Sequence, residues 1–275
     1  MFGRTTLTSR VEAWECDFNG HWNTRFYARA FQEAAERAAI LAGEENPGVT
    51  ALGARHLRFL RELFSGAPVE VSTAVVVGGA FDGALVHFLT SEGRLAATAI
   101  DRPGVASRAL PRIDAVELDA SLPRGLGAFD PGSWKLDTVS LPATELGIVR
   151  PSDLDHRGAM LFDDLVRRAA YAAHEKVVGM GISPQFMEET GIGRMLVEMR
   201  VTFASHPRAG VALCATSTLL SLGRRHIESA YCISSSGGEA VALVELYMLA
   251  VDLRQRKVVD FPDAFLARNM DSGFA

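Results

Sequence analysis

The sequence predicts an α+β protein in which one β-α-β-β-β-β unit is written twice. Three observations lead to this prediction. Strand-like and helix-like segments follow the same order in both halves, an aspartate-containing turn precedes the helix in each half, and a stretch rich in proline and glycine separates the halves. We therefore expect residues 1–102 and 135–275 to form two similar domains, joined by a linker over residues 103–134.

The first half opens with a short polar segment of alternating character, Thr5–Ala13, and continues into the turn Asp17–Asn23. Apolar residues then recur at three- and four-residue spacing, which predicts a helix over Trp22–Ala42. Gly43 is a suitable helix stop. Four strand-like segments follow, separated by glycine-containing turns that suit hairpins: Leu52–Leu63, Pro68–Val77, Ala84–Ser91 and Arg94–Asp101.

The second half repeats this order. A predicted strand, Val139–Val149, leads to the turn Asp153–Met160 and to a predicted helix over Ala159–Val178. Four strand-like segments complete the half: Arg194–Ala204, Gly210–Leu222, Ile227–Ser234 and Glu239–Asp252. The repeated order predicts that both halves fold alike.

Two registers relate the halves. One places Asp155 on Asp17 and, with the same shift, Gly158 on Gly20. The other places Gly210 on Gly66 and aligns the strands that follow. A longer loop after the second helix accounts for the difference between the two registers.

The run Glu15–Tyr27, E-C-D-F-N-G-H-W-N-T-R-F-Y, is similar to the D-x-x-G-H-x-N signature of hotdog-fold thioesterases of the 4-hydroxybenzoyl-CoA thioesterase-like group. Leu57–Val71 resembles the strand-turn-strand that follows the helix in that family. The pattern D-x-N-x-H-x-N also resembles the catalytic loop of acyl-ACP thioesterases, which are tandem hotdogs with this loop in the C-terminal hotdog. The resemblance implies a double hotdog, with a continuous curved antiparallel sheet around two central helices.

The resemblance also implies the hydrolysis of an acyl-CoA or acyl-ACP thioester to a free acid and a thiol. Asp17 is the expected nucleophile or general base, and Asn19, His21 and Asn23 are expected to orient the carboxylate, the water or the thioester carbonyl. We expect the backbone N–H groups near His21–Asn23 to donate to the oxyanion. A turn of this composition is also a common helix cap, so the residues alone leave a structural role open.

Four residues are expected to contact the substrate: Gly20, Trp22, Tyr27 and Glu33. Gly20 allows the backbone to approach a ligand closely. Glu33 and Glu36 resemble positions where some relatives carry a helix carboxylate; a solvent-facing position is the alternative, and Glu33 is the better functional candidate of the two.

The second turn lacks most of this motif. It keeps Asp155 and Gly158, but Ala159 stands where the first turn has His21, and Leu161 stands where it has Asn23. We therefore predict that the second turn is a pseudo-site, which keeps the helix-capping aspartate and lacks the catalytic residues.

Charged residues within the predicted strands call for a structural interpretation. Arg55, Arg58 and Arg61 alternate with bulky apolar residues, which favours a solvated strand face. Glu245 lies inside an apolar strand, so we expect a buried partner for it.

The composition argues against several classes of protein. With 33 acidic and 28 basic residues, the formal charge of −5 does not indicate the excess of basic residues that binding to nucleic acid or an anionic membrane requires. No apolar stretch is long enough to span a bilayer, and the N-terminus does not read as a signal peptide. The three cysteines form no C-x-x-C pair, so we expect no disulfide framework and a cytoplasmic location.

No metal motif and no nucleotide-binding glycine loop is present in the sequence, so we expect no cofactor. Two further functions stay open: a hotdog dehydratase or hydratase acting on an acyl thioester, and a non-catalytic acyl-thioester-binding protein. The acyl chain, the choice between CoA and ACP, and a homodimer of double hotdogs are also left open.

Overall fold

The computed structural model describes residues 3–17, 19–49, 52–104, 109–118, 122–126 and 143–271. The chain divides into two compact units. Unit 1 contains Met1–Pro123, Arg150–Arg167 and His206–Ala209, and unit 2 contains Arg124–Val149, Arg168–Ser205 and Gly210–Ala275. The predicted domain boundaries and the predicted joining of two sheets into one stay predictions.

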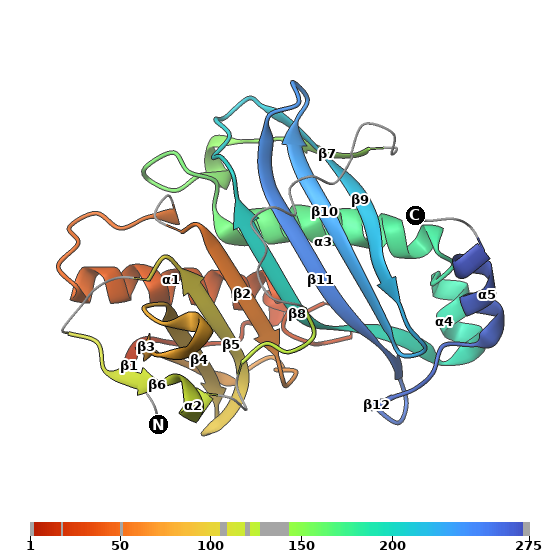
Figure 1. Cartoon of the computed structure of the whole chain (residues 1–275), viewed down its shortest axis with the longest axis horizontal. Helices are drawn as coiled ribbons and strands as arrows, with labels where there is room; N and C mark the ends of the chain where they lie inside the picture. Colours follow the sequence, from red (N-terminus) through yellow and green to blue (C-terminus); the bar gives the residue numbers. More distant parts are fainter. Residues whose placement is uncertain are drawn as a thin grey trace. The chain divides into compact units, whose positions relative to one another are not determined.

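Unit 1 contains an antiparallel sheet in the order β1-β3-β4-β5-β2 (Figure 1). Its strands are β1 (Arg4–Arg10), β2 (Ala54–Phe59), β3 (Pro68–Val77), β4 (Leu85–Ser91) and β5 (Arg94–Arg102). The short strand β6 (Arg112–Asp114) pairs in parallel with β3 and leads into helix α2 (Ala115–Leu118). Both short elements lie in the predicted linker, where the sequence shows no sustained periodicity.

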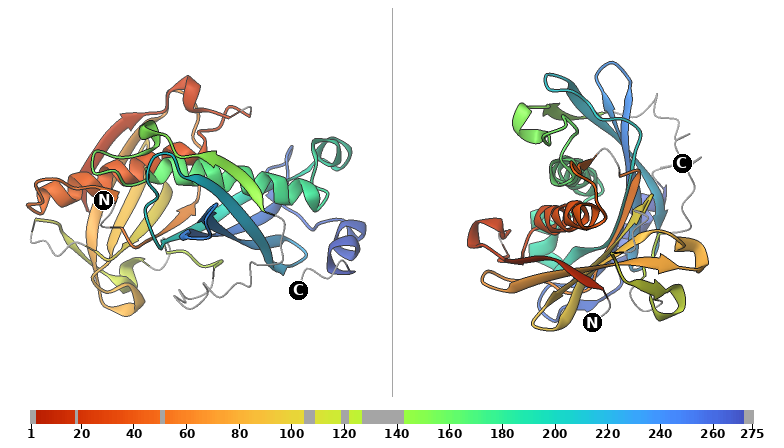
Figure 2. Two further views of the ribbon diagram at one scale, coloured as in Figure 1. Left: turned by 90° about the horizontal axis from the view of Figure 1, so that it is seen from above. Right: turned by 90° about the vertical axis from the view of Figure 1, so that its left-hand side faces the viewer.

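Helix α1 (Thr24–Leu41) packs against β1, β3 and β4 of this sheet. Figure 2 shows it end-on in the right-hand view, with the strands of unit 1 curving past it. The stripe that faces the sheet combines two large aromatic side chains with small residues, which lets the helix approach the strands closely. Its buried members include Tyr27, Phe31, Ala34 and Ala38.

Unit 2 contains a second antiparallel sheet, in the order β7-β9-β10-β11-β8. Its strands are β7 (Thr144–Ile148), β8 (Ile192–Phe203), β9 (Ala212–Leu222), β10 (His226–Ser235) and β11 (Ala240–Asp252), and β12 (Lys257–Val258) pairs with β11. The remaining helices are α3 (Phe162–Gly179), α4 (Pro184–Thr190) and α5 (Asp263–Asp271). Within the described residues, no helix is long and apolar enough to cross a membrane.

The predicted duplication is confirmed by the strand order, which is the same in both sheets. When Asp155 is placed on Asp17, helices α1 and α3 coincide from their first to their last residue. The second register is confirmed by hydrogen bonds: Val11 N–H donates to Ala67 O in one half, and Val149 N–H donates to Val211 O in the other, both at 2.9 Å. The chain is thus an α+β protein in which one β-α-β-β-β-β motif occurs twice.

The prediction that Arg55 lies on a solvated face is wrong. Arg55 is fully buried because β2 pairs with β5 in a register that sets Arg55 opposite Asp101. Arg55 Nε and Nη2 donate to the two carboxylate oxygens of Asp101 at 2.6 Å each, and His87 Nε2 lies 3.2 Å from Asp101 Oδ2. Burial raises the pKa of Asp101, but the charge and hydrogen bonds of Arg55 and then of His87 outweigh burial and hold this pKa well below its usual range.

The expected buried partner of Glu245 is Arg200. These two residues are paired in the register of β8 and β11, and Arg200 donates two hydrogen bonds of 2.6 Å to the Glu245 carboxylate. Both side chains are more than nine-tenths buried. The strand pair β8–β11 therefore carries a buried arginine–carboxylate pair, as the corresponding strand pair β2–β5 does.

Candidate active site

Asp17 organises the turn between the 3₁₀ helix η1 (Ala13–Glu15) and α1. Its Oδ1 accepts hydrogen bonds from the backbone N–H groups of Asn19 at 2.8 Å and His21 at 3.0 Å. The N–H of Asp17 donates to the carbonyl oxygen of His21 at 2.8 Å. These contacts close the turn around the carboxylate, as expected of an aspartate in a turn.

The second oxygen of Asp17 sets this carboxylate apart. Among the residues that the structure describes, every hydrogen bond to the Asp17 side chain goes to Oδ1. The side chain is half-buried. Oδ2 is therefore the atom of this carboxylate that can take a proton from water or attack a carbonyl carbon.

Gly20 is required by backbone conformation. Its φ is +77°, a value that L-residues rarely adopt, and a Cβ at this position would meet nothing within 4 Å. Glycine is therefore explained by the left-handed turn, with no close approach of another group.

The predicted oxyanion donors are otherwise engaged, so this part of the prediction is wrong. The N–H of His21 donates to Asp17 Oδ1, that of Trp22 to the carbonyl oxygen of Leu63 at 2.7 Å, and that of Asn23 to the carbonyl oxygen of Glu15 at 3.0 Å. The first of these bonds closes the turn, and the other two join it to the segments around Leu63 and Glu15.

Asn23 is the N-cap of α1. Its side-chain oxygen accepts the N–H of Arg25 at 3.0 Å, which satisfies a donor of the first helical turn. The side chain of Asn19 is exposed beside Asp17 in the same turn. The structure thus assigns a capping role to Asn23 and leaves its predicted catalytic role a prediction.

Glu62 is a candidate site residue that the sequence did not indicate. His21 Nδ1 lies 3.4 Å from Glu62 Oε1, and the His21 ring meets the Phe64 ring edge-on with centroids 5.3 Å apart. Glu62 is an acid between the end of β2 and the turn that leads into β3. That position is its only local signal, because its partner is distant in the sequence.

Trp22 and Tyr27 form a buried support behind the turn. They are only 6% and 3% exposed, and their ring centroids are 4.3 Å apart. Trp22 Nε1 donates to Glu15 Oε2 at 2.9 Å, which also ties the indole to η1. Their predicted contact with substrate stays a prediction.

Glu33 is exposed on α1 and lines a groove of about 420 Å³. The groove runs along strand β1, and its other lining residues are Thr5, Thr6, Leu7, Thr8, Glu36, Arg37 and Ile40. Although part of the side chain is exposed, desolvation of the carboxyl within the groove raises the pKa of Glu33, and the nearby Arg29 opposes this shift. This carboxyl therefore lines a groove of unit 1 whose walls are both polar and apolar.

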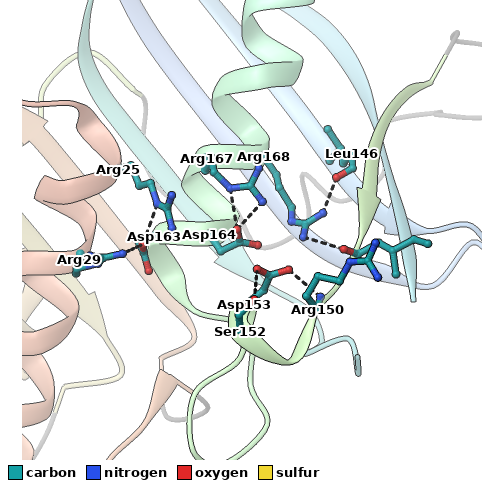
Figure 3. Close-up of polar contacts among 11 residues, drawn as sticks. Arg25, Arg29, Leu146, Arg150, Ser152, Asp153, Asp163, Asp164, Arg167 and Arg168 are labelled. Carbon is teal, nitrogen blue, oxygen red and sulfur yellow. Dashed lines mark hydrogen bonds and ion pairs between the residues drawn. The ribbon is translucent and has the colours of Figure 1, made fainter. Parts of the chain in front are cut away.

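An ion-pair cluster ties the first turn of α3 to α1 (Figure 3). Arg25 Nε and Arg29 Nη2 both donate to Asp163 Oδ2, at 3.0 and 2.9 Å. Asp163 is almost fully buried, whereas about a third of each arginine side chain is exposed. In the same turn of α3, Arg167 bonds Asp164. The second aspartate turn is thereby held within unit 1.

The second turn reproduces the hydrogen bonds of the first. Asp155 Oδ1 accepts the N–H groups of Arg157 at 2.8 Å and Ala159 at 2.9 Å, and Gly158 has a φ of +80°. The difference lies at Oδ2, which accepts the N–H of Val49 at 3.0 Å. Both oxygens of Asp155 are therefore used in structural hydrogen bonds.

No group of three or more His, Cys, Asp or Glu side chains suited to a metal ion occurs in the part of the chain that the structure describes. The three cysteines, Cys16, Cys214 and Cys232, are not in disulfides and are half-buried. The first turn brings together the Asp17 carboxylate, the His21 imidazole and the Glu62 carboxylate.

The model of the thioesterase-like superfamily matches residues 11–116 and 149–268. A search of curated proteins found no match. Among solved structures, an acyl-ACP thioesterase from Bacteroides thetaiotaomicron is similar with a TM-score of 0.55 and 12% identity, over 88% of this chain and 96% of that one.

Two further structures are similar over most of their lengths. The 12:0-ACP thioesterase from Umbellularia californica has a TM-score of 0.56 and 12% identity, over 89% of this chain and 93% of its own. The tesB protein of Mycobacterium avium subs paratuberculosis has a TM-score of 0.52 and 16% identity, over 88% and 91%. At these identities the likeness shows the fold, which is two hotdog units in tandem.

Proposed function

The chain belongs to the thioesterase-like superfamily, and from this premise we propose that it hydrolyses an acyl-CoA or acyl-ACP thioester at the Asp17 turn. The observation that supports this proposal is the difference between the two aspartates. Among the described residues, no hydrogen bond goes to Asp17 Oδ2, whereas both carboxylate oxygens of Asp155 accept backbone N–H groups.

In the proposed reaction, Asp17 Oδ2 takes a proton from water as the water attacks the thioester carbonyl. The carboxylate can alternatively attack the carbonyl itself, which gives an anhydride that water then opens. The turn keeps Oδ1 fixed in both routes, so Oδ2 is held in one direction. Such positioning lowers the entropic cost of reaching the transition state.

His21 and Glu62 are the proposed proton-transfer pair. Glu62 Oε1 lies 3.4 Å from His21 Nδ1 and can hold the imidazole ring in one orientation. A protonated His21 can deliver a proton to the departing thiolate, so that the products are a free acid and a thiol. The side chain of Asn19 lies in the same turn and is the proposed donor to the carbonyl oxygen, in place of the backbone groups that are engaged elsewhere.

The substrate comes from the class of acyl thioesters. Two of the similar structures are named as an acyl-ACP thioesterase and a 12:0-ACP thioesterase. These names support the class of acyl thioesters without deciding between a CoA and an ACP thiol. We propose a cytoplasmic enzyme without a cofactor; pairing into a homodimer of double hotdogs stays part of the proposal.

The test is thiol release from a panel of acyl-CoAs and acyl-ACPs of graded chain length. We expect turnover with at least one panel member and a loss of at least about 100-fold in Asp17→Asn, which keeps the two backbone hydrogen bonds but removes the base. The same panel should be assayed for hydration of enoyl thioesters. Hydration without thiol release would favour a hydratase and contradict the proposal.

A further inference from the structure

Glu62 lies in a segment where the chain leaves the sheet. β2 ends at Phe59, and the N–H groups of Leu60 and Arg61 bond to the carbonyl oxygen of Ala96 at 2.8 and 3.0 Å. Two further backbone groups of this segment, the carbonyl of Arg61 and the N–H of Leu63, bond to a side chain.

That side chain is Tyr27. Its hydroxyl donates to the carbonyl oxygen of Arg61 at 3.1 Å and accepts the N–H of Leu63 at 3.1 Å. Arg61 and Leu63 are the two chain neighbours of Glu62, so one hydroxyl fixes the main chain on both sides of this residue. The carbonyl of Leu63 then accepts the N–H of Trp22, which joins the segment to the Asp17 turn.

The surroundings of Tyr27 suit this use. The ring packs against Trp22 and meets Phe59 edge-on with centroids 5.6 Å apart, and the residue is 3% exposed. Burial raises the pKa of Tyr27 well above its usual value, and the hydrogen bond from Leu63 opposes this only in part. The hydroxyl therefore keeps its proton and can donate and accept at the same time.

We propose that Tyr27 is a positioning residue, whose hydroxyl clamps the main chain around Glu62 and so holds the Glu62 carboxylate against His21. This inference rests on the proposed function, because it takes His21 and Glu62 as the proton-transfer pair.

The second half of the chain offers a comparison. Placing Asp155 on Asp17 sets Leu165 at the position of Tyr27, and placing Gly210 on Gly66 sets Pro207 at the position of Leu63. Leucine has no hydroxyl and proline has no N–H, so neither member of the clamp is present. His206 stands at the position of Glu62 and Ala159 at that of His21. The clamp and the pair that it supports are thus missing together.

The first experiment is Tyr27→Phe, which keeps the ring and removes the hydroxyl. We expect kcat to fall about tenfold at an unchanged KM, as for the loss of one to two hydrogen bonds that support the site. The pH–rate profile should change in the same way as in Glu62→Gln. In a Glu62→Gln background, Tyr27→Phe should have no further effect on kcat.

The matched control is Tyr231→Phe. Tyr231 is a fully buried tyrosine of unit 2, and its hydroxyl accepts a hydrogen bond from Ser229 at 3.1 Å. We expect its turnover and pH–rate profile to match those of the wild type. Equal losses in Tyr27→Phe and Tyr231→Phe would reflect general destabilisation and would overturn the proposal.

Amide hydrogen exchange at Leu63 tests the clamp without any substrate. We expect this exchange to be faster in Tyr27→Phe than in the wild type and unchanged in Tyr231→Phe. If the wild type hydrolyses no thioester, the proposed function fails while this measurement still reports on the clamp. The positioning role is overturned if Leu63 exchange is unchanged, or if Tyr27→Phe lowers kcat equally with and without Glu62→Gln.

Discussion

The two aspartate turns have the same backbone conformation and lie in different surroundings. Asp17 and Asp155 each accept two backbone N–H groups at Oδ1, and each turn closes on a glycine with a φ near +80°. The turns diverge at the second oxygen, which Val49 caps only in the second turn. They also diverge at His21, which is replaced by Ala159.

This difference separates the structural part of the motif from the chemical part. Because the second turn keeps its full set of backbone hydrogen bonds without a histidine, the aspartate and the glycine suffice to build the turn. Catalysis in the first turn then depends on groups that the fold does not need: an uncapped oxygen, an imidazole and the carboxylate of Glu62.

The largest expected effect concerns the buried ion pairs that the two sheets share. Arg55→Leu removes the arginine partner of buried Asp101 and leaves only His87 beside it, and Arg200→Leu removes the arginine partner of buried Glu245. Each substitution should lower the free energy of unfolding by about 3–5 kcal/mol, measured by urea denaturation. Similar losses would confirm equivalent roles, and a loss in only one variant would break the equivalence of the halves.

Low pH should lower the stability of the first half because it protonates Asp101. Its pKa is lowered in the folded protein, so its contribution to stability is complete above its ordinary pKa of about 4 and is lost as the pH falls below that value. Thermal unfolding from pH 7 to pH 3 should show a decline that begins near pH 4. Asp101→Asn, although less stable at pH 7, should show a shallower decline; an equal slope would assign acid sensitivity to other groups.

Glu62→Gln removes the charge beside His21 and keeps the size of the side chain. We expect kcat to fall about tenfold, which corresponds to about 1.4 kcal/mol, since His21 loses the carboxylate that orients its ring. Steady-state kinetics over a range of pH would measure this loss. His206→Gln, at the corresponding position of the second half, should leave kcat unchanged.

The last expected effect is shared by the two turn glycines. Gly20→Ala and Gly158→Ala each force a side chain into a left-handed conformation, at a cost of about 1–2 kcal/mol in the free energy of unfolding. Calorimetry should show similar losses for both. Only Gly20→Ala should also lower kcat, and an equal loss of kcat in Gly158→Ala would show that the second turn takes part in turnover.

Much of the fold could be predicted because it depends on local periodicity. The strand Pro68–Val77 has the predicted bounds, and helices α1 and α3 begin two or three residues after the predicted starts. The pieces that escaped prediction include β6 and α2, which are too short to show a period, and α4 and α5, which lie outside the repeated order of elements.

The site was predictable only in part because its contacts join distant segments. The aspartate, glycine and histidine of the first turn follow from a motif within seven residues. Glu62 and the engaged donor of Trp22 depend on the segment around Leu63, and the burial of Arg55 depends on the pairing of β2 with β5. No local pattern carries this information.

The most direct measurement is thiol release by Asp17→Asn and Asp155→Asn, assayed side by side with thermal unfolding. If hydrolysis takes place only at the Asp17 turn, turnover should fall at least about 100-fold in Asp17→Asn, with little change in stability. Asp155→Asn should keep full turnover, with stability lowered by about 1–2 kcal/mol because the N–H of Val49 loses its acceptor. Full turnover in Asp17→Asn, or equal losses in both variants, would contradict a single site at the first turn.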